Sequence, residues 1–216
     1  MTDARSRVLE RVRGALGRSG PVDQTTREAL EARLRQPPAH SRIAFDQEPV
    51  ERFIDKAQSV AATVTRVASM VDVGAEVAGF LKRHNLAAEL VAAPALAELQ
   101  WPAQLEVTFG ATDGSHATSV TPCRAAVAET GSLVMLSGVA TPTTLNLLPD
   151  NHVVVVRRSQ VVRDFETLWQ QLREIDGPLP RTLNLITGPS RTADIEQTMQ
   201  LGAHGPRRVH IVLVED

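Results

Sequence analysis

Two stretches of the chain contain unusually long runs of β-branched and other apolar residues, and they restrict the fold more than any other feature. Residues 152–158 read HVVVVRR, and residues 209–214 read VHIVLV. A strand with one solvated face alternates apolar and polar side chains, whereas a continuous apolar run needs cover on both faces. Such strands belong to mainly parallel sheets, so both runs are predicted in the middle of one.

Strand-like and helix-like segments alternate from residue 49 onward, which is the pattern of an α/β protein. Asp72 and Asp164 are plausible N-caps of two helices, and a third helix is predicted over about 193–201. The predicted fold is α/β, with a mainly parallel sheet flanked by helices. Its strands are expected at 63–68, 88–92, 105–109, 124–128, 132–137, 153–157, 182–187 and 209–214.

The first 40 residues have a different pattern. Apolar residues recur at helical spacing over 4–16 and 25–34, and the stretch QPPAHSRIAF at 36–45 has two prolines and no periodicity. The sequence therefore predicts an N-terminal helical arm, residues 1–40, joined to an α/β domain, residues 41–216.

Composition limits the classes of function that the sequence leads us to expect. A formal net charge of -2 gives no reason to expect nucleic acid or membrane as a partner. Cys123 is the only cysteine, so the chain cannot supply the thiolates that hold an iron-sulfur cluster. No apolar run approaches the ~20 residues of a membrane span and no signal peptide is visible, which predicts a cytoplasmic protein. The six histidines lack ligand-like spacing, so no metal site is predicted.

The segment ITGPSRTADIEQTMQLGAHGP, residues 186–206, places two glycine-proline corners around the third predicted helix. The N-terminus of a helix that follows a parallel strand is a common anion site. Gly188, Ser190, Arg191 and Asp194 are therefore candidate ligand-binding residues, with a solvated helix cap as the alternative. His204 is expected at the opposite end of the sheet from Ser190.

Two further segments carry candidate residues. In AVAETGSLVMLSG, residues 126–138, Glu129 precedes a turn at Thr130 and Gly131, which are candidate ligand-binding residues. The Glu129 carboxylate could act as nucleophile, base or hydroxyl anchor. The alternative is a turn residue that faces water. In the loop 138–152, Asn146 could bind a hydroxyl or carboxylate group, although ordinary turn chemistry explains it equally well.

Three motifs, AETGSLVMLSG, LNLLPDNHVVVV and GPSRTADIEQTMQLGAHGPRRVHIVLVED, resemble the LutC/YkgG family of lactate utilization proteins, which consist of a LUD domain. The resemblance covers about residues 120–216. It implies a fold like that of the ribose-5-phosphate isomerase, glucosamine-6-phosphate deaminase and CoA-transferase group. It also implies a part in the oxidation of L-lactate to pyruvate, together with iron-sulfur proteins of the same operon. The clusters are then expected on those partners, and no cofactor on this chain.

Three hypotheses follow. In the first, the chain is a subunit without clusters that binds a small carboxylate, or the partner iron-sulfur protein, at the carboxyl edge of its sheet. Glu129 and Arg191 then anchor the ligand, and Ser190 is a donor. In the second, it is a stand-alone enzyme of the isomerase, deaminase or CoA-transferase type. Glu129 is then a base or acyl nucleophile, and the turn 188–190 binds phosphate or CoA oxygens. In the third, the arm 1–40 docks another protein.

Overall fold

The structure is a computed structural model, and it describes residues 3–18, 20–35, 43–175, 177, 180–193, 199–201 and 204–216. The chain divides into two compact units, Met1–Ser41 and Arg42–Asp216. Whether residues 1–40 and 41–216 fold as independent domains stays a prediction.

The first unit contains two helices, α1 (Ala4–Ala15) and α2 (Gln24–Arg35). Neither helix has a buried side chain. The apolar side chains that gave the helical periodicity are exposed; they are Val8, Leu9, Val12, Leu16, Leu30 and Leu34.

The second unit is built on a six-stranded sheet of order β1-β12-β7-β4-β2-β3, in which every pair is parallel. The two β-branched runs are neighbours at its centre, where Ile211 lies opposite Val154. The predicted α/β fold with a mainly parallel sheet is confirmed. The strands are β1 (Thr63–Val67), β2 (Glu89–Ala92), β3 (Glu106–Phe109), β4 (Thr118–Pro122), β7 (Asn151–Arg157) and β12 (Arg208–Val214).

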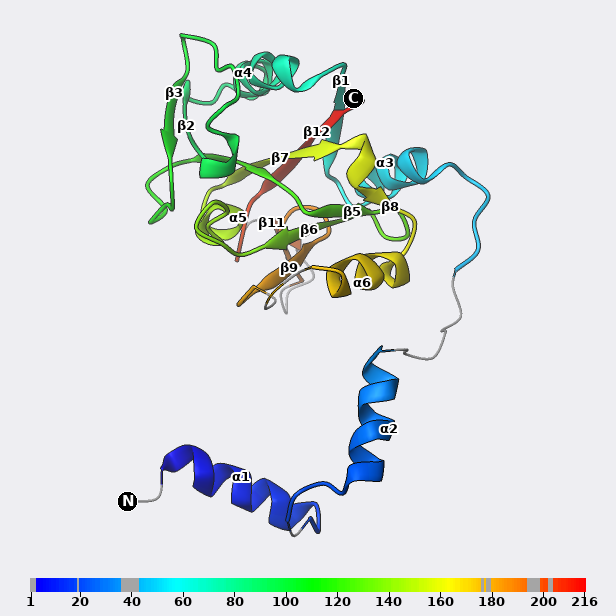
Figure 1. Cartoon of the computed structure of the whole chain (residues 1–216). Helices are drawn as coiled ribbons and strands as arrows, with labels where there is room; N and C mark the ends of the chain where they lie inside the picture. Colours follow the sequence, from blue (N-terminus) through cyan, green and yellow to red (C-terminus); the bar gives the residue numbers. More distant parts are fainter. Residues whose placement is uncertain are drawn as a thin grey trace. The chain divides into compact units, whose positions relative to one another are not determined.

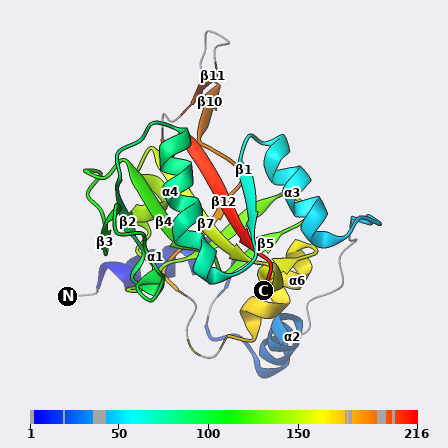
Figure 2. The same cartoon turned by 90° about the horizontal axis from the view of Figure 1, so that it is seen from above.

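Both faces of the central strands are covered, as their composition requires. On one face Val153 and Val155 pack with Phe80 of α4 (Val73–Arg83). On the other face Val154 packs with Phe53 of α3 (Pro49–Ser59). Figures 1 and 2 show the two helices on opposite faces of the sheet.

A second sheet, of order β8-β5-β6-β9, packs on the same face as α3. Its strands are β5 (Ala125–Val127), β6 (Ser132–Leu136), β8 (Val161–Val162) and β9 (Leu183–Ile186). The β5–β6 and β6–β9 pairs are antiparallel. Ala126 and Leu133 face the central core, whereas Val127 and Val134 are covered by α6 (Phe165–Arg173). The predicted strands thus divide between two sheets (Figure 1).

Short elements complete the unit: the turns η1 (Met70–Asp72), η2 (Pro94–Leu96) and η3 (Arg158–Gln160), and helix α5 (Thr144–Leu147). Asp164 caps α6 as predicted, since its Oδ1 accepts from the Thr167 backbone N–H at 2.8 Å. Asp72 occupies the N-cap position of α4 but makes no capping bond to that helix. Its carboxylate accepts instead from the backbone and hydroxyl of Ser69, at 3.0 Å each.

The predicted helix over 193–201 is wrong. Residues Arg191–Ala193 (β10) and Met199–Leu201 (β11) form an antiparallel pair, with Arg191 opposite Leu201. The physical reason is that the two glycine-proline corners lie next to each other: the backbone N–H of Ser190 donates to the carbonyl of Pro206 at 2.8 Å. A nine-residue helix would hold its ends roughly 13 Å apart. Asp194 lies outside the described residues.

Candidate functional site

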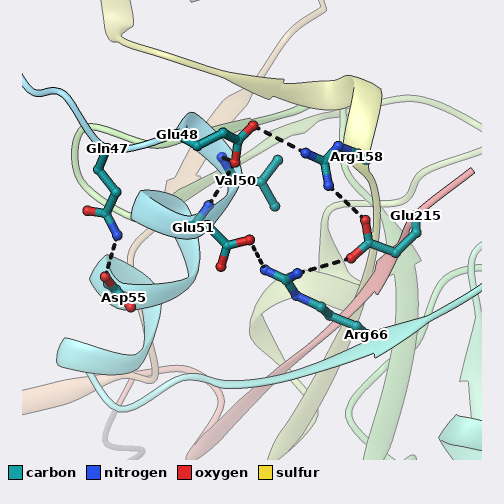
Figure 3. A network of polar contacts seen from close by, with 8 residues as sticks. All are labelled: Gln47, Glu48, Val50, Glu51, Asp55, Arg66, Arg158 and Glu215. Carbon is teal, nitrogen blue, oxygen red and sulfur yellow. Dashed lines mark hydrogen bonds and ion pairs between the residues drawn. The ribbon is translucent and has the colours of Figure 1, made fainter.

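The carboxyl ends of parallel strands are where α/β proteins bind ligands, and the ends of β1, β12 and β7 are occupied by ion pairs (Figure 3). Arg158 lies 2.9 Å from Glu215 and 3.3 Å from Glu48, while Arg66 lies 3.4 Å from Glu215 and 2.5 Å from Glu51. Each guanidinium is already shared by two carboxylates. This part of the edge is therefore poorly suited to attract an anion.

The end of β4 opens instead onto a cavity of about 190 Å³. Residues of both sheets line it, because β4 leads directly into β5 and the cavity lies beside β6. The lining consists of Thr121, Pro122, Cys123, Arg124, Met135, Leu136, Thr141 and Asn146.

Helix α5 brings Asn146 to this cavity. The hydroxyl of Ser119, on β4, donates to the Leu145 carbonyl at 2.6 Å and so holds α5 against the sheet. Leu145 itself is fully buried against Val91 and Ala93. Asn146 is only 4% exposed as a result. Of the predicted ligand-binding residues, it is the one that lines this cavity.

A buried histidine supports another lining residue. His152 is 0% exposed, and its Nε2 lies 2.7 Å from the hydroxyl oxygen of Thr121. Burial lowers the pKa of His152 to about 3, so the ring is neutral at physiological pH. Within the described part of the chain its Nδ1 has no hydrogen-bond partner.

Cys123 also lines the cavity, but its chemistry is restrained by burial. Burial raises the pKa of the thiol to about 12. The reactive form of a cysteine is the thiolate. Cys123 therefore contributes a small, uncharged surface rather than a nucleophile.

Glu129 does not line this cavity. Its Oε2 accepts a hydrogen bond from the backbone N–H of Phe165 at 3.2 Å, at the first turn of α6. Its own backbone N–H donates to the Arg163 carbonyl at 3.0 Å. A carboxylate at a helix start is stabilised by the free N–H groups and the helix dipole. A catalytic role for Glu129 stays a prediction, and its hydrogen bond supports a capping role.

The two glycine turns meet at the C-terminal end of α3. A Cβ atom on Gly131 would lie 2.4 Å from the Ala57 nitrogen, and one on Gly188 would lie 2.4 Å from the Val60 oxygen. Nη2 of Arg191 donates to that same Val60 oxygen at 3.0 Å. Helix C-terminal carbonyls lack intrahelical partners, so Arg191 caps α3.

A chain of hydroxyl groups links the same two turns. The hydroxyl of Thr130 lies 2.6 Å from that of Ser132, which lies 2.7 Å from that of Thr187. The structure thus brings together Thr130, Gly131, Gly188 and Arg191, although not around the cavity. Their role in ligand binding stays a prediction.

The predicted separation of Ser190 from the second corner is wrong, because β10 and β11, which lie between them in the chain, pair antiparallel. Ser190 is bonded to Pro206, and a Cβ on Gly205 would lie 3.3 Å from the Cβ of Ser190. His204 directly precedes this contact. The predicted anion site depended on a helix N-terminus after Ser190. Residues Arg191–Ala193 form a strand instead, so this argument for an anion site no longer holds.

Comparison with known protein families concerns the part of the chain that holds the cavity and the two glycine turns. A family profile for the LUD domain matches residues 114–214. This part of the chain, just under half of it, is similar to a LUD domain. All residues that line the cavity, and both glycine turns, lie within this part of the chain. The resemblance inferred from the three motifs is confirmed.

The most similar proteins include a lactate utilization protein C of Exiguobacterium sp., 37% identical over 100 residues, or 45% of this chain and 44% of that protein. Another lactate utilization protein C, of Halalkalibacterium halodurans, is 36% identical over 42% of this chain and 40% of its own length. The match therefore spans less than half the length of these relatives.

Among solved structures, a DUF162 family protein of Deinococcus radiodurans has a TM-score of 0.53 and 22% identity, over 77% of this chain and 96% of that one. This likeness concerns the fold alone. In the described part of the chain, every helix is too short or too polar to cross a lipid bilayer. The same residues contain no cluster of three or more His, Cys, Asp or Glu side chains suited to a metal ion.

The residues that sequence reasoning missed are Thr121, Arg124, Thr141 and His152. Three of them line the cavity, and His152 supports Thr121. The segment ATSVTP was not predicted as a strand, so Arg124, at the start of the predicted strand 124–128, was not placed beside the carboxyl end of a parallel strand. These residues could have been found by reading ATSVTP as a parallel strand, because its carboxyl end leads to Thr121 and Arg124.

Proposed function

We propose that this chain is a component of an L-lactate utilization system, in which L-lactate is oxidised to pyruvate. The observation that carries the proposal is the similarity of residues 114–214 to a LUD domain, together with relatives named lactate utilization protein C. The oxidation releases two electrons and two protons, so it needs an electron acceptor.

In this proposal iron-sulfur proteins of the same system accept the electrons. The single, buried Cys123 supports this division, because a cluster needs several thiolate ligands. The chain itself binds no cofactor and contributes to substrate binding and assembly.

Reconstitution would test this proposal. The chain and its two iron-sulfur partners are purified without oxygen, and pyruvate formation from L-lactate is measured with and without the chain. We expect pyruvate formation and cluster reduction only when all three proteins are present. An unchanged rate in the absence of this chain would show that it is not part of the system.

A further inference from the structure

We propose that the cavity at the carboxyl end of β4 binds a small monocarboxylate with an oxygen on its 2-carbon, either a 2-hydroxy or a 2-oxo acid. The choice of L-lactate and pyruvate as probes rests on the proposed function, whereas the site rests on the contacts below.

Asn146 supplies the first observation. Its side chain is 4% exposed and lines the cavity, yet the described residues offer it no hydrogen-bond partner. The amide atoms are not among the side-chain atoms that are fully buried without a partner, so they remain accessible from the cavity. The amide is therefore available to a molecule inside the cavity, and its two donors suit a hydroxyl or carbonyl oxygen.

Arg124 supplies the second observation. It lines the same cavity and is solvent-exposed, and among the described residues no carboxylate pairs with its guanidinium. It contrasts with Arg66 and Arg158, which are each shared by two glutamates. A free guanidinium binds a carboxylate with two parallel hydrogen bonds.

Thr121 and His152 supply the third. Since the His152 ring is neutral, one of its nitrogens carries a proton and the other does not. With the proton on Nε2, the ring donates to the Thr121 oxygen, and the Thr121 hydroxyl is free to donate into the cavity. An acceptor oxygen of the ligand would favour this tautomer, so we assign His152 as a positioning residue.

Size and charge define the ligand class. The cavity of about 190 Å³ is smaller than the ~300–1,000 Å³ typical of sites for drug-sized ligands. Among the described residues Arg124 is the only charged one in the lining, which suits a single negative charge rather than a phosphate dianion. Pro122, Met135 and Leu136 add apolar surface, which suits a methyl group.

Binding measurements on the full chain would test the site. L-Lactate, pyruvate, propionate and inorganic phosphate are titrated by calorimetry and by NMR into the wild type, Arg124→Gln and Asn146→Leu. Arg33→Gln, at an exposed position of α2, is the matched control. Arg124 is exposed, so its variant tests the site even if Asn146→Leu folds poorly.

We expect L-lactate or pyruvate to bind the wild type and the control equally. Either ligand should shift the backbone amide signals of Thr121, Cys123, Arg124, Thr141 and residues 143–146. Loss of one hydrogen bond to a charged group should weaken binding about tenfold or more in Arg124→Gln. Propionate, which lacks the oxygen on its 2-carbon, should bind roughly tenfold more weakly than lactate to the wild type. This difference should disappear in Asn146→Leu.

Three results would overturn the site: no carboxylate binds the wild type, both variants bind lactate as the wild type does, or phosphate binds more tightly than lactate. If the reconstituted system still oxidises lactate in any of these cases, the proposed function stands without this site. If lactate binds as expected but pyruvate formation does not depend on the chain, the site stands and the proposed function fails.

Discussion

Gly131 is needed both for the backbone conformation of its turn and for close packing against α3. Its φ of +73° lies in the left-handed region, and the nearest backbone atom would be only 2.4 Å from an added Cβ. Gly188 repeats the arrangement with φ of +76°. Both turns thus lie directly against α3, and their glycines hold the second sheet close to this helix.

Gly131→Ala should therefore destabilise the protein by about 3 kcal/mol or more, because backbone strain and overpacking add. Gly114→Ala is the matched control, since Gly114 has φ of +100° but no atom within 4 Å of an added Cβ. Urea unfolding of the two variants separates the packing cost from the backbone cost. Equal losses in both variants would contradict a role of Gly131 in packing.

At the scale of elements, the start of α6 is held by two carboxylates. Asp164 accepts from the Thr167 backbone N–H at 2.8 Å, and Glu129 accepts from that of Phe165 at 3.2 Å. The second bond also ties α6 to the end of β5. Glu129 is thus explained by the helix that it caps.

Glu129→Gln should lower the free energy of unfolding by roughly 0.5–1 kcal/mol, because the amide oxygen still accepts but the charge beside the helix dipole is lost. Thermal unfolding and pyruvate formation in the reconstituted system are measured together. We expect a full rate. A loss of activity of a hundredfold or more in a stably folded variant would restore Glu129 as a catalytic residue.

The β10–β11 hairpin can be distinguished from a helix by a disulfide. Arg191 and Leu201 are paired in the hairpin, where facing Cα atoms lie roughly 4.5–5.5 Å apart, within the range for a disulfide. In a helix the same ten steps would span about 15 Å.

The double variant Arg191→Cys/Leu201→Cys should therefore oxidise to an intramolecular disulfide, detected by mass spectrometry after alkylation of free thiols. The control is the double variant Arg191→Cys/Met199→Cys, whose two positions do not lie opposite each other in the hairpin. It should remain reduced. Equal oxidation of both pairs would argue against a fixed hairpin. Cys123 is buried and should not compete.

At the scale of the whole molecule, the central sheet buries two histidines in neighbouring strands. His152 lies on β7 and His210 on β12, and the latter stacks on Phe80 with ring centroids 4.6 Å apart. Burial lowers the pKa of His152 to about 3 and that of His210 to about 4, with Glu76 partly opposing the second shift. Both rings are neutral in the folded protein at pH values where the unfolded chain binds protons.

Stability should therefore fall as the pH falls below 6.5, the ordinary pKa of a histidine. From pH 7.5 to pH 5.5 each histidine should cost about 1.4 kcal/mol of the free energy of unfolding. His152→Gln should reduce this loss by that amount. Urea unfolding at the two pH values measures the difference, and a wild type that is equally stable at both would contradict the prediction.

Much of the main unit could be predicted, because its signals are local. The runs around Val154 and Ile211 can be accommodated only where both faces are covered, and the structure places them there. The division into two sheets could not be predicted, since β5 and β6 are short apolar runs that fit either sheet equally well. Which sheet they join depends on contacts between distant segments.

The site was predicted less well for the same reason. The glycine, serine and arginine of the corner segments were recognised as candidate residues. Their contacts in the folded protein were not predicted, because they are made with residues that lie far away in the sequence. Gln, Met and Leu near residues 197–201 favour helix locally, yet the bond between Ser190 and Pro206 brings the chain back. Arg124 was missed because its position depends on β4.

The bond between Ser190 and Pro206 has a consequence for the tolerance of the chain to insertion. The chain leaves the body of the unit and returns at one point, and the strands β10 and β11 between these positions stand away from both sheets (Figure 2). Lengthening a segment whose ends are held together changes loop entropy only slowly. An epitope or a fluorescent tag inserted between β10 and β11 should therefore leave the sheets unaffected, which makes this part of the chain the natural place to label the protein.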